Sequence, residues 1–422
     1  MHHSGVKKVL TRGLFVAVAL TSLGLAACGS NGGGGSGGKA LKIATDLPVS
    51  GTDAAVGLPT QNGATLAVQQ NQDLGSGYTL SIVNKNDEGT SGPDASVGAA
   101  NIQALVSDSA VMAVVGPFNS GVAKQEIPVA NGSGLVLMSP ANTNPGLTKE
   151  QYADANGINF ALLHPAGKPN YYFRLPGTDD VQGKVDADIA LAAPVSATTA
   201  YVVDDSTTYG KGLATVFTQE FTAKGGTIAG STSITANQVS SLPQLATTII
   251  SKNPGVVFYG GVTSGGGAAL KKALVEKNGN MPMVGGDGIA DDPAFLQTAG
   301  AAAAVNTYGT VAAPDISGLT NAAAQKFITD YKAAFPGKDL LPYSAMAYDA
   351  AMIEITAIKN LIKAGKDVTR KAVRDEIQGI TYSGVTGSIS FDQNGDNAGQ
   401  KVYSVYGVGT DGQWKFTQLI QA

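Results

Sequence analysis

A few polar side chains lie directly after apolar segments, where a folded chain exposes groups that bind other molecules. Asn119 and Ser120 follow the apolar run VMAVVG (111–116) and begin a stretch with helical spacing. A hydroxyl and the free amides at a helix start can hold an anion, although a serine at this place is equally compatible with a plain helix cap. Asp287 lies in GGDG (285–288), whose glycines let another molecule approach the backbone closely. Its carboxylate can pair with a cation or stabilise its own turn.

Other kinds of reactive site find little support in the sequence. The chain has one cysteine and three histidines, two of which stand at positions 2 and 3, so neither a thiolate zinc cluster nor a histidine-rich metal centre is expected. Neighbouring aspartates diverge along a strand or helix, which favours cap, turn and hinge roles for Asp179-Asp180, Asp204-Asp205 and Asp291-Asp292. We therefore expect no enzymatic chemistry, no metal and no cofactor.

Length and composition favour a globular protein of two or more domains. The chain has 422 residues, of which 43% are hydrophobic and 14% are charged. Its formal net charge of −4 gives no basic field to attract a phosphate backbone. We therefore do not expect nucleic-acid binding.

The amino terminus has the features of a secretory signal. Lys7, Lys8 and Arg12 precede an apolar run at 14–27 that carries no charge. This run is too short to span a bilayer as a helix. We expect residues 1–27 to be a signal peptide that is removed on export.

The end of this run resembles the lipobox of bacterial lipoproteins. The residues are LAAC (25–28), with the only cysteine of the chain at the last position. The resemblance implies that Cys28 carries a diacylglycerol and that lipid holds the protein outside the cytoplasmic membrane. A buried free cysteine is the alternative. Residues 28–39 are rich in glycine and serine and are expected to be a flexible linker.

From residue 41 onward, short apolar runs alternate with longer segments of helical spacing. The pattern predicts an α/β fold with two parallel sheets, since a dozen strands in one open sheet is unusual. The expected strands are 41–46, 79–84, 111–115, 135–138, 199–203, 227–232, 255–259, 282–284 and 307–311. The expected helices are 55–72, 93–107, 120–131, 180–193, 209–224, 241–252, 264–277 and 291–298.

The pattern changes after residue 312. Consecutive helices are expected at 318–335, 343–364 and 369–377, followed by a strand-rich segment at 380–417. Residues 148–170 fit no strong period and are expected to be a long surface connection with a weak helix. His164 falls in this connection, and we expect it to be a solvated loop residue.

The loops after the expected strands resemble those of one known family. They are LPVSG (47–51), VVGPFNSG (114–121), LMSPANTNPGLT (137–148), FRLPGTDDVQG (173–183), DDSTTYGKG (204–212), FYGGVTSGGG (258–267), VGGDG (284–288) and ISFDQNGD (389–396). Their common order and spacing resemble the type I periplasmic binding proteins, and within them the branched-chain amino-acid (Leu/Ile/Val) substrate-binding lipoproteins of ABC transporters. The similarity covers nearly all of residues 40–422.

The resemblance implies two parallel-sheet α/β lobes joined by a three-stranded hinge. One lobe would hold 40–178 and 313–384, and the other 179–312 and 385–422. A small ligand would be enclosed when the lobes close. Ligands of open parallel sheets bind beyond the carboxyl ends of the strands, so the same loops are where a site is expected on physical grounds.

The resemblance also assigns roles to individual residues. Ser120, beside Asn119, would bind a ligand carboxylate. Ala141 and Thr143 would contact the carboxylate and amino groups of the ligand. Asp287 would pair with its α-ammonium.

Three further residues belong to this expected site. Tyr209 matches a tyrosine that lies over the ligand in the family, although packing at a helix start is the alternative. Val262 and Val56 stand where branched-chain amino-acid receptors often present tyrosines. Because two valines widen the pocket and remove phenolic hydroxyls, the side-chain specificity of those receptors does not transfer to this chain.

The function implied by the resemblance is that of an extracytoplasmic, lipid-anchored solute receptor. It would deliver a branched-chain or related amino acid to the permease subunits of an ABC importer. One alternative is a ligand-sensing subunit for a membrane signalling partner, and another is a receptor for a small amide or an aromatic acid. A cell-surface enzyme has the least support because no nucleophile with a base is found.

Overall fold

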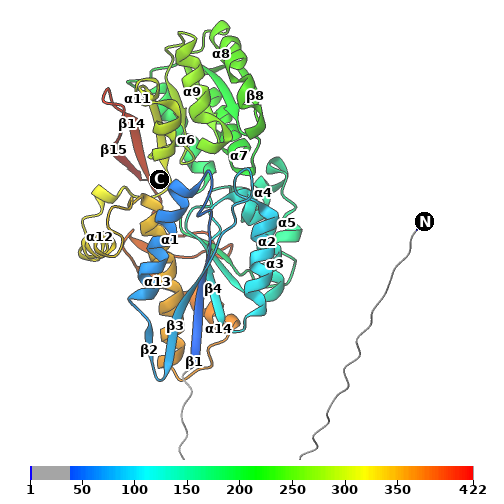
Figure 1. Cartoon of the computed structure of the whole chain (residues 1–422), viewed down its shortest axis with the longest axis vertical. Helices are drawn as coiled ribbons and strands as arrows, with labels where there is room; N and C mark the ends of the chain where they lie inside the picture. Colours follow the sequence, from blue (N-terminus) through cyan, green and yellow to red (C-terminus); the bar gives the residue numbers. More distant parts are fainter. Residues whose placement is uncertain (2–38, 422) are drawn as a thin grey trace, which may run out of the picture. The chain divides into compact units, whose positions relative to one another are not determined.

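The computed structural model describes Met1 and residues 39–421, apart from the side chains of residues 236, 237 and 239. The expected signal peptide, Cys28 and nearly all of the expected linker therefore lie outside the described residues. From residue 39 onward the described chain belongs to one compact unit with two large sheets (Figure 1). No helix in the described part of the chain has the length and apolar character needed to cross a membrane.

Six strands form the first sheet: β1 (Lys39–Asp46), β2 (Asp73–Gly75), β3 (Tyr78–Lys85), β4 (Val111–Val115), β5 (Val136–Ser139) and β6 (Tyr172–Arg174). Their order is β2-β3-β1-β4-β5-β6, and every neighbouring pair is parallel except β2 with β3. The covering helices are α1 (Ala54–Gln69), α2 (Ala95–Ser107), α3 (Ser120–Ser133) and α13 (Pro342–Lys363). This sheet and its helices are called the first lobe.

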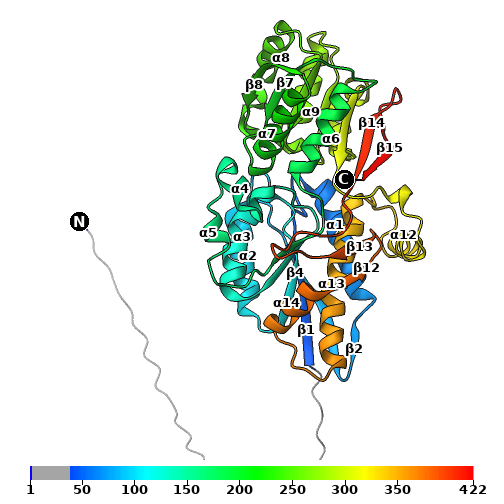
Figure 2. The same cartoon turned by 180° about the vertical axis from the view of Figure 1, so that it is seen from behind.

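Successive side chains of β4 contact different pairs of helices. Ala113 and Val115 pack with residues of α1 and α13, whereas Val114 packs with residues of α2 and α3. Successive side chains of a strand point to opposite faces. The two helix pairs therefore lie on opposite sides of the sheet, as Figures 1 and 2 show.

Seven strands form the second sheet: β7 (Thr199–Asp204), β8 (Thr227–Ser233), β9 (Val256–Gly260), β10 (Met283–Gly285), β11 (Thr307–Val311), β14 (Val402–Val408) and β15 (Trp414–Gln421). Their order is β15-β14-β11-β10-β9-β7-β8, and β14 and β15 run antiparallel to their neighbours. The helices are α6 (Asp179–Leu191), α7 (Thr208–Ala223), α8 (Leu242–Ser251), α9 (Gly267–Glu276), α10 (Pro293–Ala299) and α11 (Ala301–Ala304). This sheet and these helices are called the second lobe.

The predicted α/β class with two sheets is confirmed. All nine expected strands form, each within two residues of its expected ends. The sequence prediction missed β2, β6 and α11, which have three or four residues each and are too short to show a period. Both sheets are parallel except at their edges.

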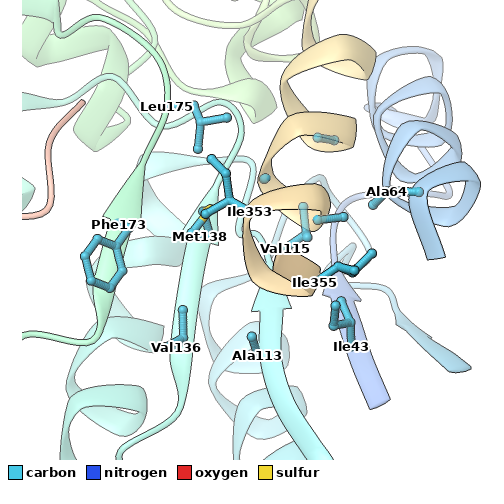
Figure 3. Packing of buried hydrophobic residues seen from close by; sticks show 14 of the residues in the cluster. Ile43, Ala64, Ala113, Val115, Val136, Met138, Phe173, Leu175, Ile353 and Ile355 are labelled. Carbon is cyan, nitrogen blue, oxygen red and sulfur yellow. The ribbon is translucent and has the colours of Figure 1, made fainter. Parts of the chain in front are cut away.

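Helix α13 is the central helix of the first lobe. Ile353 and Ile355 lie among side chains from β1, β4 and β5 (Figure 3). On its other side α13 packs against α1 at Gly63, where an added Cβ would lie 2.0 Å from the carbonyl oxygen of Ser344. Glycine is therefore required for this close approach. Helices α12 (Ala322–Ala334) and α14 (Arg370–Gly379) and the hairpin of β12 (Thr381–Ser383) and β13 (Ser388–Ser390) complete the carboxyl-terminal region.

The chain passes between the two lobes three times. These passages lie between β6 and α6, between β11 and α12, and between β13 and β14. In the third passage, Asp396 forms a buried ion pair with Arg174 at the end of β6, with an Nε to Oδ1 distance of 2.7 Å. Three passages agree with the expected three-stranded hinge.

The connection between β5 and β6 contains four short helices rather than one weak helix. They are η1 (Pro145–Leu147), α4 (Glu150–Ala153), η2 (Asp154–Asn156) and α5 (Phe160–Leu163). The expectation that His164 is solvated is wrong. Its Nε2 lies 2.6 Å from the carbonyl oxygen of Leu147 and its ring packs against Phe160, and burial lowers its pKa.

Three buried carboxyl groups meet near the carboxyl edge of the first sheet. They belong to Asp46, Asp87 and Glu126, and one oxygen of each lies within 4.8 Å of the others. Burial raises the pKa of Asp46 to about 7 and the pKa values of Asp87 and Glu126 well above their usual range. The charge of Asp46 also raises the pKa of Asp87 and Glu126, and the charge of Asp87 raises that of Glu126, whereas a hydrogen bond with Glu126 lowers the pKa of Asp46. Burial therefore favours the protonated forms of Asp87 and Glu126.

These groups make the stability of the fold depend on pH. An acid with a higher pKa in the folded state stabilises the fold at low pH, and this contribution is lost as the pH rises through the folded value. We expect the free energy of unfolding to fall between pH 5 and 8. We expect Glu126→Gln to reduce this fall, because the variant lacks one of the three carboxyl groups whose pKa is raised in the folded state.

Denaturant titrations at pH 5, 6.5 and 8 test this, with a chelator present so that no cation contributes. Glu276→Gln, at an exposed position of α9, is the matched control. An unchanged pH slope in Glu126→Gln would contradict the expectation.

Candidate ligand-binding site

A cavity of about 400 Å³ lies where loops from both lobes face each other. These loops follow β4 and β5 in the first lobe and β7, β9 and β10 in the second. Small-molecule sites typically have volumes of about 300–1,000 Å³ and lie beyond the carboxyl ends of parallel strands. Seven of the eight expected site residues line this cavity: Asn119, Ser120, Ala141, Thr143, Tyr209, Val262 and Asp287.

The first lobe presents a hydroxyl at a helix start. Ser120 is the first residue of α3, and its Oγ lies 3.4 Å from the backbone nitrogen of Asn144. The side chain of Asn119 makes no capping hydrogen bond to α3. Free amides and a hydroxyl at the start of a fourteen-residue helix favour a negatively charged partner.

The loop that carries Ala141 and Thr143 is held in place by Arg174. The buried guanidinium donates to the carbonyl oxygen of Asn144 at 2.6 Å, to Thr148 Oγ1 and to Asp396 Oδ1. Burial raises the pKa of Asp396, but the charge of Arg174 and its hydrogen bond lower it, and the pKa stays below its usual value. The ion pair therefore fixes one wall of the cavity from behind.

The second lobe presents a carboxylate between two phenols. Asp287 follows β10, and its Oδ1 accepts a hydrogen bond from Tyr209 at 2.8 Å while its Oδ2 accepts one from Tyr343 at 2.5 Å. Burial raises the pKa of Asp287, and the two phenol donors act in the opposite direction. Tyr209 is the second residue of α7 in the second lobe, whereas Tyr343 is the second residue of α13 in the first. Asp287 therefore connects the two lobes.

Asp205 positions the loop that contains Val262. Its Oδ2 accepts a hydrogen bond from the backbone nitrogen of Val262 at 2.9 Å, and its Oδ1 accepts from the backbone nitrogen and hydroxyl of Thr207. Asp205 has the expected turn role, whereas the cap of α7 is Thr207. Asp205 also lines the cavity.

A second, narrower cavity of about 40 Å³ adjoins the first. The two share Phe118, Val262, Asp287 and Gly288. Val56, the eighth expected site residue, lines only this narrower cavity. The structure therefore brings all eight expected residues to two adjoining cavities.

Sequence reasoning missed several residues at these cavities. Tyr343 lies 56 residues after Asp287, and no local pattern marks it as a site residue. Asp53 and Asp291 also line the narrower cavity. For Asp291 and Asp292 the sequence predicts hinge, turn and cap roles rather than a place in the site. Asp292 has the cap role, because it accepts a hydrogen bond from the Ala294 amide of α10.

Comparison with known proteins agrees with this architecture. A family model described as a periplasmic binding protein matches residues 40–413. The chain belongs to the periplasmic binding protein family. It is 28% identical over 386 residues to the Leu/Ile/Val-binding protein BraC3 of Rhizobium johnstonii, covering 90% of this chain and 94% of that one.

Solved structures of other periplasmic binding proteins share the fold. The substrate binding protein LivJ of Streptococcus pneumoniae, in complex with isoleucine, has a TM-score of 0.75 at 24% identity and covers 91% of this chain and 100% of that chain. A solute binding protein of R. palustris, in complex with benzoate, has a TM-score of 0.69 at 21% identity and covers 90% and 96%. As a member of this family, the chain is a solute-binding protein rather than an enzyme.

Removing the partner of Arg174 should destabilise this periplasmic binding protein. Asp396→Ala leaves a buried guanidinium without its counter-charge, and we expect a loss of about 3–5 kcal/mol in the free energy of unfolding. Denaturant titration measures this loss. Asp411→Ala, which breaks the exposed pair with Lys415, is the control and should cost no more than about 1 kcal/mol. Equal losses in the two variants would show that the buried ion pair stabilises the fold no more than the exposed one.

Proposed function

We propose that this periplasmic binding protein is the extracytoplasmic, lipid-anchored receptor of an ABC importer and binds an α-amino acid between its two lobes. One observation carries the proposal: Ser120 of the first lobe and Asp287 of the second line the same cavity. A hydroxyl with free helix amides suits a carboxylate, and a carboxylate suits an ammonium group. An α-amino acid carries both groups on one carbon.

The expected contacts suffice for useful affinity. Hydrogen bonds that involve a charged group contribute about 1.5–3 kcal/mol each. Three or four such contacts, from Ser120, Thr143, the Ala141 backbone and Asp287, give the roughly −8 kcal/mol of a micromolar complex after the cost of ordering is subtracted. Tyr209 would cover the ligand from the second lobe.

The proposal includes closure of the lobes about the three passages. The lobes would be those expected from the sequence, 40–178 with 313–384 and 179–312 with 385–422, except that β13 stays with the first lobe because Ser388–Ser390 pair with Thr381–Ser383. Hydrogen bonds that join them support a closed arrangement: Tyr343 of the first lobe donates to Asp287, and the Asn144 side chain donates to the carbonyl oxygen of Thr208 at 2.8 Å. Bound ligand would favour this state, and the permease would recognise it.

Two observations bear on alternative functions. The relatives include a Leu/Ile/Val-binding protein and a solute binding protein in complex with benzoate, so an aromatic acid is a second candidate ligand. Asp287 disfavours this candidate because benzoate has no cation to pair with it. A sensory role would use the same closure but signal to a membrane partner instead of a permease.

Replacing Asp287 should weaken amino-acid binding. We expect Asp287→Asn to lower affinity by about 2–5 kcal/mol, because the ligand ammonium loses its counter-charge. We expect Ser120→Ala to cost about 1–3 kcal/mol through the lost hydrogen bond to the ligand carboxylate. Calorimetry with an amino acid and its amide separates the two effects, since the amide lacks the carboxylate and should be insensitive to Ser120→Ala. Unchanged affinity in Asp287→Asn would remove this residue from the site.

Replacing Cys28 should release the protein from membranes. We expect Cys28→Ser to shift the protein from the membrane fraction to the soluble fraction in a bacterial host, because a serine cannot carry the thioether-linked lipid. Fractionation followed by immunoblotting measures this. Retention of the variant in the membrane fraction would exclude the proposed anchor.

A further inference from the structure

The narrower cavity continues the proposed amino-acid site in the direction available to a ligand side chain. Ser120 and the loop with Ala141 and Thr143 line only the larger cavity, where they would hold the carboxylate. Asp287 lines both cavities, so the α-carbon of a ligand would lie near their junction. The side chain would then extend into the narrower cavity.

Apolar residues form the walls next to this junction. Phe118 and Val262 line both cavities, and Val56 and Val311 line the narrower one. Phe118 packs edge-to-face on Tyr343, with ring centroids 5.6 Å apart and an interplanar angle of 87°. A volume of about 40 Å³ suits an unbranched chain of methylene groups better than a branched or aromatic side chain.

Four aspartates are among the other residues that line the narrower cavity. It is lined by Asp53, Asp291 and Asp292 in addition to Asp287, and the larger cavity adds Asp205. No lysine, arginine or histidine is among the described residues that line either cavity. The two cavities together therefore offer a negative field with no internal counter-charge.

Asp291 differs from the other aspartates of the cavities in its hydrogen bonding. Asp205, Asp287 and Asp292 each accept hydrogen bonds described above, whereas none to the Asp291 carboxylate is found among the described residues. Asp291 also has a left-handed backbone conformation, with φ of 55°, which is uncommon for a residue other than glycine. Burial, followed by the charges of Asp315, Asp292 and Asp339, raises its pKa to about 7.

Asp53, from the first lobe, lines the same cavity as Asp291. It lies immediately before α1 of the first lobe and makes no capping hydrogen bond to that helix. Burial raises its pKa, and hydrogen bonding with Ser264, Thr52 and Asn119 acts in the opposite direction. Bringing ionised acids from two lobes to one cavity costs free energy unless they take up a proton or a cation joins them.

We propose that the ligand is an α-amino acid whose unbranched side chain ends in a cation, such as ornithine, lysine or arginine. This inference rests on the proposed function and adds the side-chain class. The methylene groups pass between Phe118, Val56 and Val262, and the cationic end lies between Asp53 and Asp291. The valines at 56 and 262 leave this path open, where the larger tyrosines often found at these positions would narrow it.

The same charges disfavour the ligand classes that relatives bind. A leucine side chain would desolvate Asp53 and Asp291 without pairing them, and buried unpaired carboxylates are costly. An aromatic acid would bring a second negative charge to the five aspartates around the cavities. A cationic side chain instead gains charge-assisted hydrogen bonds, each worth roughly twice a neutral one.

A panel of matched amino acids tests the inference on the full chain. Calorimetry would compare L-ornithine, L-lysine and L-arginine with L-norleucine, which has an unbranched apolar side chain, and with L-leucine and benzoate. We expect at least one cationic amino acid to bind tenfold or more tightly than norleucine and leucine. Equal or tighter binding of norleucine, leucine or benzoate would overturn the inference. Binding of leucine alone would leave the proposed function intact, whereas binding of no amino acid would count against both.

Neutral variants identify the residues that hold the cation. We expect Asp291→Asn and Asp53→Asn each to weaken binding of the preferred cationic amino acid about tenfold and to leave norleucine binding unchanged. Glu276→Gln removes the same charge at a remote, exposed position and should change neither. A parallel loss for norleucine, or an equal loss in Glu276→Gln, would show that these aspartates do not recognise the side chain. The ligand panel on the unmodified chain remains decisive if a variant fails to fold.

Discussion

The carboxylate of Asp287 imposes the central constraint on this molecule. It accepts hydrogen bonds from a phenol of each lobe, so its position depends on α7 and α13 together. The neighbouring backbone has little freedom, because an added Cβ on Gly286 would lie 2.6 Å from the Tyr209 hydroxyl and one on Gly288 would lie 2.3 Å from the carbonyl oxygen of Gly261. A carboxylate fixed in this way is already oriented toward the cavity and loses little freedom when a cation binds.

The opposite wall is fixed by a different device. Arg174 holds the loop after β5 through the carbonyl oxygen of Asn144 and the hydroxyl of Thr148, and its own charge is balanced by Asp396 from the third passage between the lobes. The third passage between the lobes and the cavity-lining loop after β5 therefore share one buried ion pair. On the second lobe, Asp205 fixes the loop of Val262 by accepting its backbone hydrogen bond. Both devices place polar groups at the cavity without using the side chains that face a ligand.

The residues that line the cavities, rather than the fold, bear on the ligand of this periplasmic binding protein. A fold common to proteins in complex with isoleucine and with benzoate does not specify the ligand. Five aspartates line the two cavities, with no basic residue among the described lining groups. Two valines, Val56 and Val262, line the narrower cavity. The proposed preference for a cationic side chain follows from this combination of charge and space.

The amino-acid sequence by itself determined the alternation of strands and helices, because burial on one or both faces leaves a local period in the chain. It also placed eight candidate residues at the ends of strands, where resemblance to a family gave them roles. Only the tertiary structure decided which distant groups meet: Tyr343 with Asp287 across 56 residues, and Arg174 with Asp396 across 222 residues. Tertiary packing also places the His164 ring against Phe160, where the sequence predicted a solvated side chain. Such contacts carry no local signature, because they depend on how separately formed elements pack against one another.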